Sequence, residues 1–267
     1  MAGIYDVHCH LNDNLYIELD ISSSELVRDA KDSGIDLLNC VGYDVKSSKL
    51  AIIQAEKNSQ VYALVGIHPN EAHLFSDEAV EQIDFLANAN KVVGIGEIGL
   101  DYSRSKRYKD RQRKIFRDQL NLAIKHNLPV CLHFHDDGSD QVYRDGLKIL
   151  KEFPKLKGAM LHSFAGPWAV AEEFLNLGCY LSFNGDITNN KNMREAATRI
   201  PWNRMLVESD APYKAPRPYE KKINYPRFLP VVINVIASLR NVSSEVVIAT
   251  TSDNGRELFG LNGKKDA

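Results

Sequence analysis

Eight short apolar runs rich in β-branched residues alternate along the chain with longer amphipathic stretches, and this alternation constrains the fold most strongly. Such runs predict buried parallel strands, and the stretches between them predict helices that cover the sheet. Dividing 267 residues among eight units leaves about 33 for each, a normal size for this repeat. The predicted strands are Ile4–Cys9, Ile35–Val41, Val61–Ile67, Val92–Glu97, Pro129–Phe134, Gly158–His162, Tyr180–Asn184 and Arg204–Glu208.

The helical patterns complete a closed α/β barrel. A chain of about 250 residues suits either two domains or one (β/α)8 TIM barrel. We find no internal sequence repeat and no linker, which favours a single TIM-barrel domain over residues 1–267. The predicted helices are Ser24–Asp32, Ser47–Lys57, Asp77–Asn88, Asp110–Lys125, Ser139–Glu152, Trp168–Leu177, Asn190–Arg199, Arg227–Arg240 and Ser244–Leu258.

Composition excludes several other classes of protein. The chain carries a net charge of −2, with 44% hydrophobic and 25% charged residues, which is typical of a globular protein rather than a disordered one. No apolar run approaches the roughly 18 residues of a membrane helix, and the N-terminus does not resemble a signal peptide. The four cysteines are far apart in apolar stretches. They predict buried, reduced thiols and therefore a cytoplasmic location.

Most histidines follow the predicted strands. Because the carboxyl ends of the strands meet at one face of a barrel, these side chains are expected to converge there. His8 and His10 alternate on the first strand, so both can point to the barrel axis. Glu208 and Asp210 repeat this spacing if the eighth strand stays extended. The polar residues at or just beyond the carboxyl-terminal ends of the predicted strands are His8, His10, His68, Glu97, His133, His135, His162, Glu208 and Asp210.

Clustered imidazoles and carboxylates indicate a metal site. Buried charges are costly unless they are paired or bind a metal, and these ligand types suit zinc, manganese, iron, nickel or cobalt. A lone histidine at a strand end is more often structural, but repetition in phase with the barrel is not explained in that way.

The number of candidates exceeds the three or four protein ligands of one catalytic metal, so two divalent ions are expected. By chain order, Glu97 is the central candidate for a bridging carboxylate. The expected ligands of one ion are His8, His10 and Asp210, and those of the other are His133 and His162.

At these positions the chain resembles the TatD-related metal-dependent deoxyribonucleases, which belong to the amidohydrolase-like superfamily. The ordered set of motifs runs through nearly the whole chain and is highly specific. The motifs are HCH at 8–10, GIHPN at 66–70, GEIGLDY at 96–102, LPVCLH at 128–133, LHSFAG at 161–166 and ESDAPY at 208–213.

The resemblance implies a TIM barrel with one or two divalent ions such as magnesium, manganese or zinc. The implied ligands are His8, His10, Glu97, His133, His162 and Asp210, in agreement with the spacing. It also implies that Asp210 orients or deprotonates the attacking water. His68 occupies the family's GxHP position near the site, and His135 stands where the family usually has an arginine, so both are expected substrate contacts. Glu208 is expected to orient His8 or His10, or alternatively to cap a helix or form a salt bridge.

Residues 104–117 contain eight basic side chains and one acid. They follow the predicted fourth strand, so they are expected to bind phosphates, with Arg104, Lys106 and Arg107 in the loop as the better candidates. The competing interpretation is a solvated helix face paired with surface acids. Arg217, in a proline-rich stretch after the eighth strand, is a further expected phosphate contact.

Three functions follow from these features. The leading hypothesis is a metal-dependent nuclease that trims single-stranded DNA, with a 3′-to-5′ direction inherited from the family. The second is a hydrolase of a small molecule or of a tRNA-linked ester, amide or phosphoester. The third is a non-catalytic binding protein built on the barrel. No sequence feature indicates a membrane or an obligate protein partner.

Overall fold

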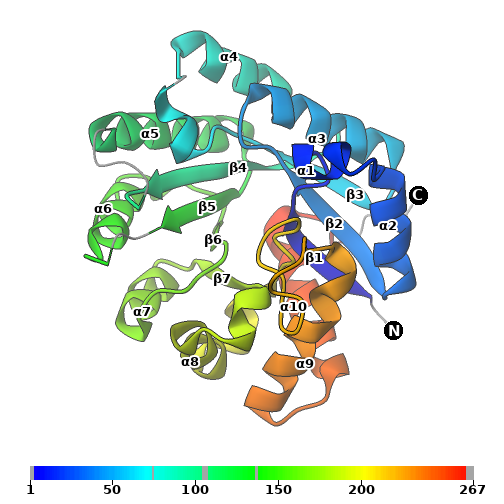
Figure 1. Cartoon of the computed structure of the whole chain (residues 1–267). Helices are drawn as coiled ribbons and strands as arrows, with labels where there is room; N and C mark the ends of the chain where they lie inside the picture. The colour runs from blue at the N-terminus through cyan, green and yellow to red at the C-terminus, as the bar shows by residue number, and fades with distance from the viewer. Residues whose placement is uncertain (1–2, 74, 104–107, 136–137, 263–267) are drawn as a thin grey trace.

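The fold is a barrel of eight parallel strands surrounded by helices (Figure 1). The computed structural model describes residues 3–73, 75–103, 108–135 and 138–262. Neighbouring strands pair in chain order from β1 to β8. The strands are β1 (Ile4–Cys9), β2 (Ile35–Val41), β3 (Val61–Val65), β4 (Val92–Asp101), β5 (Val130–His135), β6 (Ala159–Leu161), β7 (Tyr180–Phe183) and β8 (Met205–Val207).

The first and last strands meet beyond the end of β8. The Asp210 amide donates to the His8 carbonyl at 2.9 Å, and the His10 amide donates to the Ala211 carbonyl at 2.8 Å. These bonds bring the predicted ligands after β8 beside those of β1. The predicted TIM barrel is confirmed.

The helices follow the predicted order. Ser22 starts α2 with a capping box, in which its side chain accepts from the Glu25 amide. The short helix α1 was not predicted, because its five residues are too few for a periodic pattern. The helices are α1 (Asn14–Glu18), α2 (Ser23–Asp32), α3 (Val45–Lys57), α4 (Asp77–Leu86), α5 (Lys109–His126), α6 (Gln141–Leu150), α7 (Trp168–Asn176), α8 (Lys191–Arg199), α9 (Leu229–Arg240) and α10 (Ser244–Phe259).

Strand β4 differs most from its prediction, since it continues past Glu97 to Asp101. Its pairing with β5 shifts register between Ile95 and Ile98 and then continues to the end of β4. Gly99 permits this close approach, because a Cβ atom there would lie 2.1 Å from a carbonyl oxygen of β5. Glu97 therefore lies at an irregularity inside the strand, where such a bulge can redirect a side chain.

Two apolar layers support the barrel. One fills its interior with residues such as Tyr5, Leu64 and Met160, and the ring of Phe259 from α10 lies 6.1 Å from that of Tyr5. The larger layer lies between the strands and the surrounding helices. This packing leaves the opposite end of the barrel, at the strand carboxyl ends, for polar side chains.

All four cysteines are free and buried, which confirms the prediction of reduced thiols. Within the described residues, no single helix has the length and apolar character of a membrane span. Two consecutive helical segments, Pro226–Arg240 and Ser244–Phe259, together have the length and apolar composition of a membrane span, but the chain bends by 110° between them.

Candidate active site

A cavity of about 450 Å³ opens at the carboxyl ends of the strands. Five of its lining residues are predicted metal ligands: His10, Glu97, His133, His162 and Asp210. The sixth, His8, is fully buried beneath them. The strand-end positions identified in the sequence therefore converge in space.

His8 and His10 present their Nε2 atoms to each other at 3.1 Å. The Nδ1 atom of His10 lies 3.0 Å from the Val41 carbonyl, and that of His8 lies 3.2 Å from the Cys131 sulfur. A carbonyl only accepts, so Nδ1 of His10 carries a proton and Nε2 faces the site. A shift of register in β1 between Asp6 and Cys9 accompanies this arrangement.

Glu97 lies between two groups of histidines. Its Oε1 atom is 2.6 Å from His133 Nδ1 and 2.8 Å from His162 Nε2. Its Oε2 atom is 3.7 Å from His8 Nε2 and 3.8 Å from His10 Nε2. The carboxylate thus presents one oxygen to each group, which is the arrangement expected of a bridge.

Asp210 completes the first group. Its Oδ1 atom lies 3.7 Å from His8 Nε2 and 3.6 Å from His10 Nε2. The chain leaves β8 at Val207, and Asp210 has a left-handed φ of 53°. Glu208 and Asp210 therefore do not repeat the alternation of the two histidines on β1.

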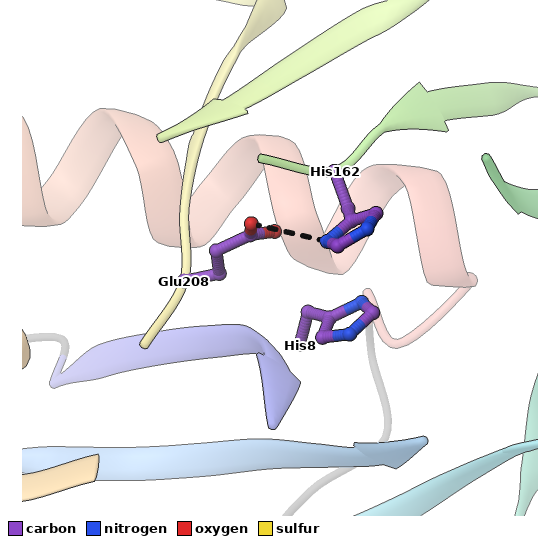
Figure 2. A group of neighbouring side chains, drawn as sticks. All are labelled: His8, His162 and Glu208. Atoms are coloured by element: carbon purple, nitrogen blue, oxygen red, sulfur yellow. Dashed lines mark ion pairs between the residues drawn. The ribbon is translucent and has the colours of Figure 1, made fainter. Parts of the chain in front are cut away.

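Buried carboxylates lie beside the ring nitrogens of His133 and His162 that point away from Glu97. Asp101 Oδ2 lies 3.5 Å from His133 Nε2, and Glu208 Oε1 lies 3.4 Å from His162 Nδ1. Figure 2 shows Glu208 directed at His162, while the His8 ring stacks on that of His162 with centroids 4.2 Å apart. The ion-pair contact of Glu208 is with His162, which matches the alternative expectation of a salt bridge. Glu208 reaches the His162 ring because its backbone follows β8, two strands from the end of β6. An orienting role toward His8 or His10 stays a prediction.

His68 has a different role from the other histidines. Its Nδ1 accepts from the Asn70 amide at 3.0 Å, so the ring proton lies on Nε2, which faces Glu97 Oε1 at 3.3 Å. Burial lowers the pKa of His68 to about 4, so the ring is neutral at pH 7. A neutral ring that donates to Glu97 steadies that carboxylate and lines the cavity.

The donor set fits divalent cations. Bonds of about 2.0–2.1 Å at angles between roughly 90° and 110° hold two ligand nitrogens about 2.9–3.4 Å apart. The Nε2 atoms of His8 and His10 meet this requirement. A backing carboxylate or carbonyl that takes the second ring proton is also typical of metal-binding histidines. Within the part of the chain that the structure describes, four groups of metal-binding side chains are close enough: His8, His162 and Glu208; His8, His10 and Asp210; His68, Glu97 and His133; and Asp101, His133 and His135.

The electrostatics favour an ionised carboxylate at the centre. Burial raises the pKa of Glu97, but the surrounding histidines, His162 first, outweigh it and hold this pKa well below its usual value. Burial and His162 lower the pKa of His8, so this ring is neutral. At His162, Glu97 and Glu208 outweigh the effect of burial and raise the pKa well above its usual value.

The expected substrate contacts have mixed outcomes. His135 lines the cavity with a side chain that is 59% exposed, and His68 lines it as well. Arg217 is not among the described residues that line the cavity; its exposed side chain lies 3.6 Å from Glu220. As a substrate contact outside the cavity, Arg217 stays a prediction. The predicted contacts Arg104, Lys106 and Arg107 lie outside the described residues.

The basic residues of α5 match the competing interpretation of a solvated helix face. Arg113 pairs with Asp145 at 2.8 Å, and Arg117 pairs with Glu152 at 2.7 Å. Lys114 likewise pairs with Asp118 at 2.8 Å. These cations are neutralised by surface acids rather than gathered at the cavity.

The sequence analysis did not identify several charged cavity residues, among them Glu71, Asp101, Asp186 and Lys214. Asp101 is buried at the end of β4 between His133 and His135. Its position within the GEIGLDY motif was a usable signal, but the predicted strand ended four residues earlier. Lys214 lines the cavity directly after the ESDAPY motif, where its neighbour Arg217 was chosen instead.

Comparisons with known proteins agree with this geometry. The family described as TatD related DNase matches residues 5–260. The metal-dependent hydrolase YabD of Bacillus subtilis is 35% identical over 262 residues, covering 97% of this chain and 100% of that protein. The 3′-5′ ssDNA/RNA exonuclease TatD of Klebsiella pneumoniae is 31% identical, covering 92% and 97%.

The crystal structure of YJJV, a TatD homologue from Escherichia coli, superimposes with a TM-score of 0.89 at 25% identity and covers 96% of this chain and 98% of that one. The family match spans nearly the whole barrel, including all the strands that carry the histidines and carboxylates of the cavity. This chain belongs to the TatD-related DNase family of metal-dependent hydrolases.

Proposed function

We propose that this protein is a metal-dependent nuclease that removes nucleotides from single-stranded DNA in the 3′-to-5′ direction at a site for two divalent ions. The observation that carries the proposal is the placement of Glu97, whose two oxygens face two separate groups of histidines. The polarity and the single-stranded substrate rest on the name of the Klebsiella pneumoniae relative.

In this proposal, His8, His10 and Asp210 would hold one ion, and His133 and His162 would hold the other. Glu97 is shared by both. Divalent cations at such a site act as Lewis acids, which lower the pKa of water and neutralise charge that develops on a phosphodiester. Magnesium, manganese and zinc are all candidates, since carboxylates and imidazoles serve each of them.

The side chains of the protein position the reacting groups. Asp210 orients the attacking water and accepts its proton, because the carboxylate lines the cavity. The group is ionised, since His10 and the other nearby histidines outweigh burial and hold its pKa below the usual value. Asp101 and Glu208 fix the orientation of His133 and His162 through their second ring nitrogens. His68 and His135 contact the substrate from the wall of the cavity.

The test is hydrolysis of an end-labelled single-stranded DNA oligonucleotide by metal-stripped protein supplied with magnesium, manganese or zinc. We expect stepwise shortening from the 3′ end that requires metal and is lost in Glu97→Gln. The matched control is Glu220→Gln, an exposed carboxylate outside the cavity, which is expected to retain full activity. An RNA oligonucleotide of the same sequence is assayed in parallel.

Absence of cleavage by protein that binds two ions would refute the nuclease proposal. It would instead favour the second hypothesis, a hydrolase of a small molecule or of a tRNA-linked ester, amide or phosphoester. Full activity in Glu97→Gln would refute the assigned site. The single domain over residues 1–267, the cytoplasmic location and the lack of an obligate protein or membrane partner remain predictions.

A further inference from the structure

Carboxylates and histidines make up most of the charged and titratable lining of the active-site cavity. Among the described residues that line it, Lys214 is the single lysine or arginine. Five carboxylates line the same cavity: Glu71, Glu97, Asp101, Asp186 and Asp210. A polyanionic substrate that enters such a cavity requires compensating positive charge. The divalent ions of the proposed function would supply part of it, and among the described lining residues Lys214 is the lysine that can add to it.

The backbone of Lys214 is held in an uncommon conformation. Its φ is 55°, in the left-handed region that residues other than glycine seldom adopt. Gly185 lies against it, since a Cβ atom there would be 2.0 Å from the Lys214 carbonyl oxygen. The side-chain amide of Asn224 donates to the carbonyl of the preceding residue, Tyr213, at 2.6 Å. Residues distant in the sequence thus fix the backbone position and conformation of Lys214, and such constrained backbone is typical of functional positions.

Asp186 orients the ammonium group. The Lys214 Nζ atom donates to Asp186 Oδ2 at 2.8 Å, and the two side chains are 40% and 31% exposed. Burial lowers the pKa of Lys214, but the bond to Asp186 outweighs it and raises the pKa, so the group stays charged. An ammonium group has three N–H donors, and Asp186 takes one of them. Two donors are then available to an anionic ligand in the cavity.

We propose that Lys214, oriented by Asp186, binds a non-bridging oxygen of a substrate phosphate in the active-site cavity. The inference rests on the proposed nuclease function and adds the residue that selects an anionic substrate. It also explains how a cavity without Arg217 can attract nucleic acid. The contact is a charge-assisted hydrogen bond to a phosphate oxygen.

The experiment compares Lys214→Gln and Lys214→Arg with the wild type in the metal-loaded oligonucleotide assay. Loss of a charged hydrogen bond is expected to lower kcat/KM about 10- to 100-fold in Lys214→Gln, while Lys214→Arg keeps most of the activity. The slope of log kcat/KM against log salt concentration is expected to become less negative by about 0.7, the value for one phosphate contact on a single strand. The control is Lys221→Gln, an exposed cation of the same loop, with a much smaller effect expected.

Three readouts separate binding from a structural role: the salt slope, rescue by arginine, and an unchanged urea midpoint. If wild type and Lys214→Gln share the same kcat/KM and salt slope, the phosphate contact is refuted and the nuclease function stands. If the wild type does not cleave DNA, the nuclease proposal fails, and calorimetry with inorganic phosphate decides the role of Lys214. About tenfold weaker phosphate binding in Lys214→Gln supports an anion site; equal or absent binding in both proteins refutes it.

Discussion

Glutamine in place of Glu97 is expected to remove most of the stability that divalent metals give to the folded protein. The substitution keeps the size of the side chain but replaces a charged oxygen with an amide group. Because Oε1 faces His133 and His162 while Oε2 faces His8 and His10, both halves of the site lose the charge. A substitution in one half, His162→Asn, is expected to affect that half alone.

The magnitudes follow from mass action. A ligand at 100 times its Kd stabilises the native state by about 2.7 kcal/mol per site, so two sites contribute about 5.4 kcal/mol. Altering an outer contact of a metal site costs 10- to 100-fold in affinity, and we take about 100-fold for a direct ligand. At the same metal concentration, each weakened site then contributes about 0.4 kcal/mol. Expected metal increments are about 5.4 kcal/mol in wild type, about 0.8 in Glu97→Gln and about 3.1 in His162→Asn.

Urea unfolding with and without saturating metal measures these increments, and metal analysis of dialysed protein counts the ions. Glu220→Gln serves as a control, since an exposed carboxylate outside the cavity leaves the increment unchanged. An increment in Glu97→Gln equal to that in His162→Asn would show that Glu97 serves one ion and would refute the bridge. A wild-type increment in Glu97→Gln would refute the site itself.

Three further predictions concern the framework of the barrel. Gly99→Ala is expected to lower the free energy of unfolding in urea by about 2–3 kcal/mol, because the φ of Gly99 is 142° and a Cβ atom there would lie 2.1 Å from a carbonyl oxygen of β5. The control Gly178→Ala is also at positive φ but in open space, so it is expected to cost about 1 kcal/mol. Equal costs for the two variants would contradict the close approach at Gly99. Burial raises the pKa of Asp6 from 3.8 to about 7, so its contribution to stability is present below about pH 4 and is lost as pH rises through 7. Metal-free Asp6→Asn is therefore expected to gain stability relative to wild type, by at most roughly 4 kcal/mol, between pH 4 and pH 8, and a difference that does not vary with pH would refute this assignment. Arg117→Ala, which breaks the half-exposed pair with Glu152, is expected to cost less than about 1 kcal/mol and to leave oligonucleotide cleavage unchanged; a large loss of kcat/KM would show that α5 contacts the substrate.

The number, order and type of the strands were predictable from the sequence. Buried strands require continuous apolar runs, and this requirement is local, so the runs mark each strand wherever it occurs. The histidines after β1, β5 and β6 were predictable for the same reason, since side-chain alternation and the shared direction of parallel strands determine where they point. Strand ends were less predictable, as β4 shows, because its pairing with β5 continues past Glu97 through Gly99 to Asp101.

The sequence by itself determined that polar, metal-binding side chains gather at one end of a barrel. The spacing of apolar residues that marks each buried strand depends only on residues close together in the sequence. The tertiary structure decided what each of them contacts. Asp101 became a partner of His133 through the extension of β4, and Lys214 entered the cavity while Arg217 turned to Glu220. These contacts depend on strand register and on the packing of segments that are distant in the sequence. A local sequence pattern does not specify how close two such segments come to each other.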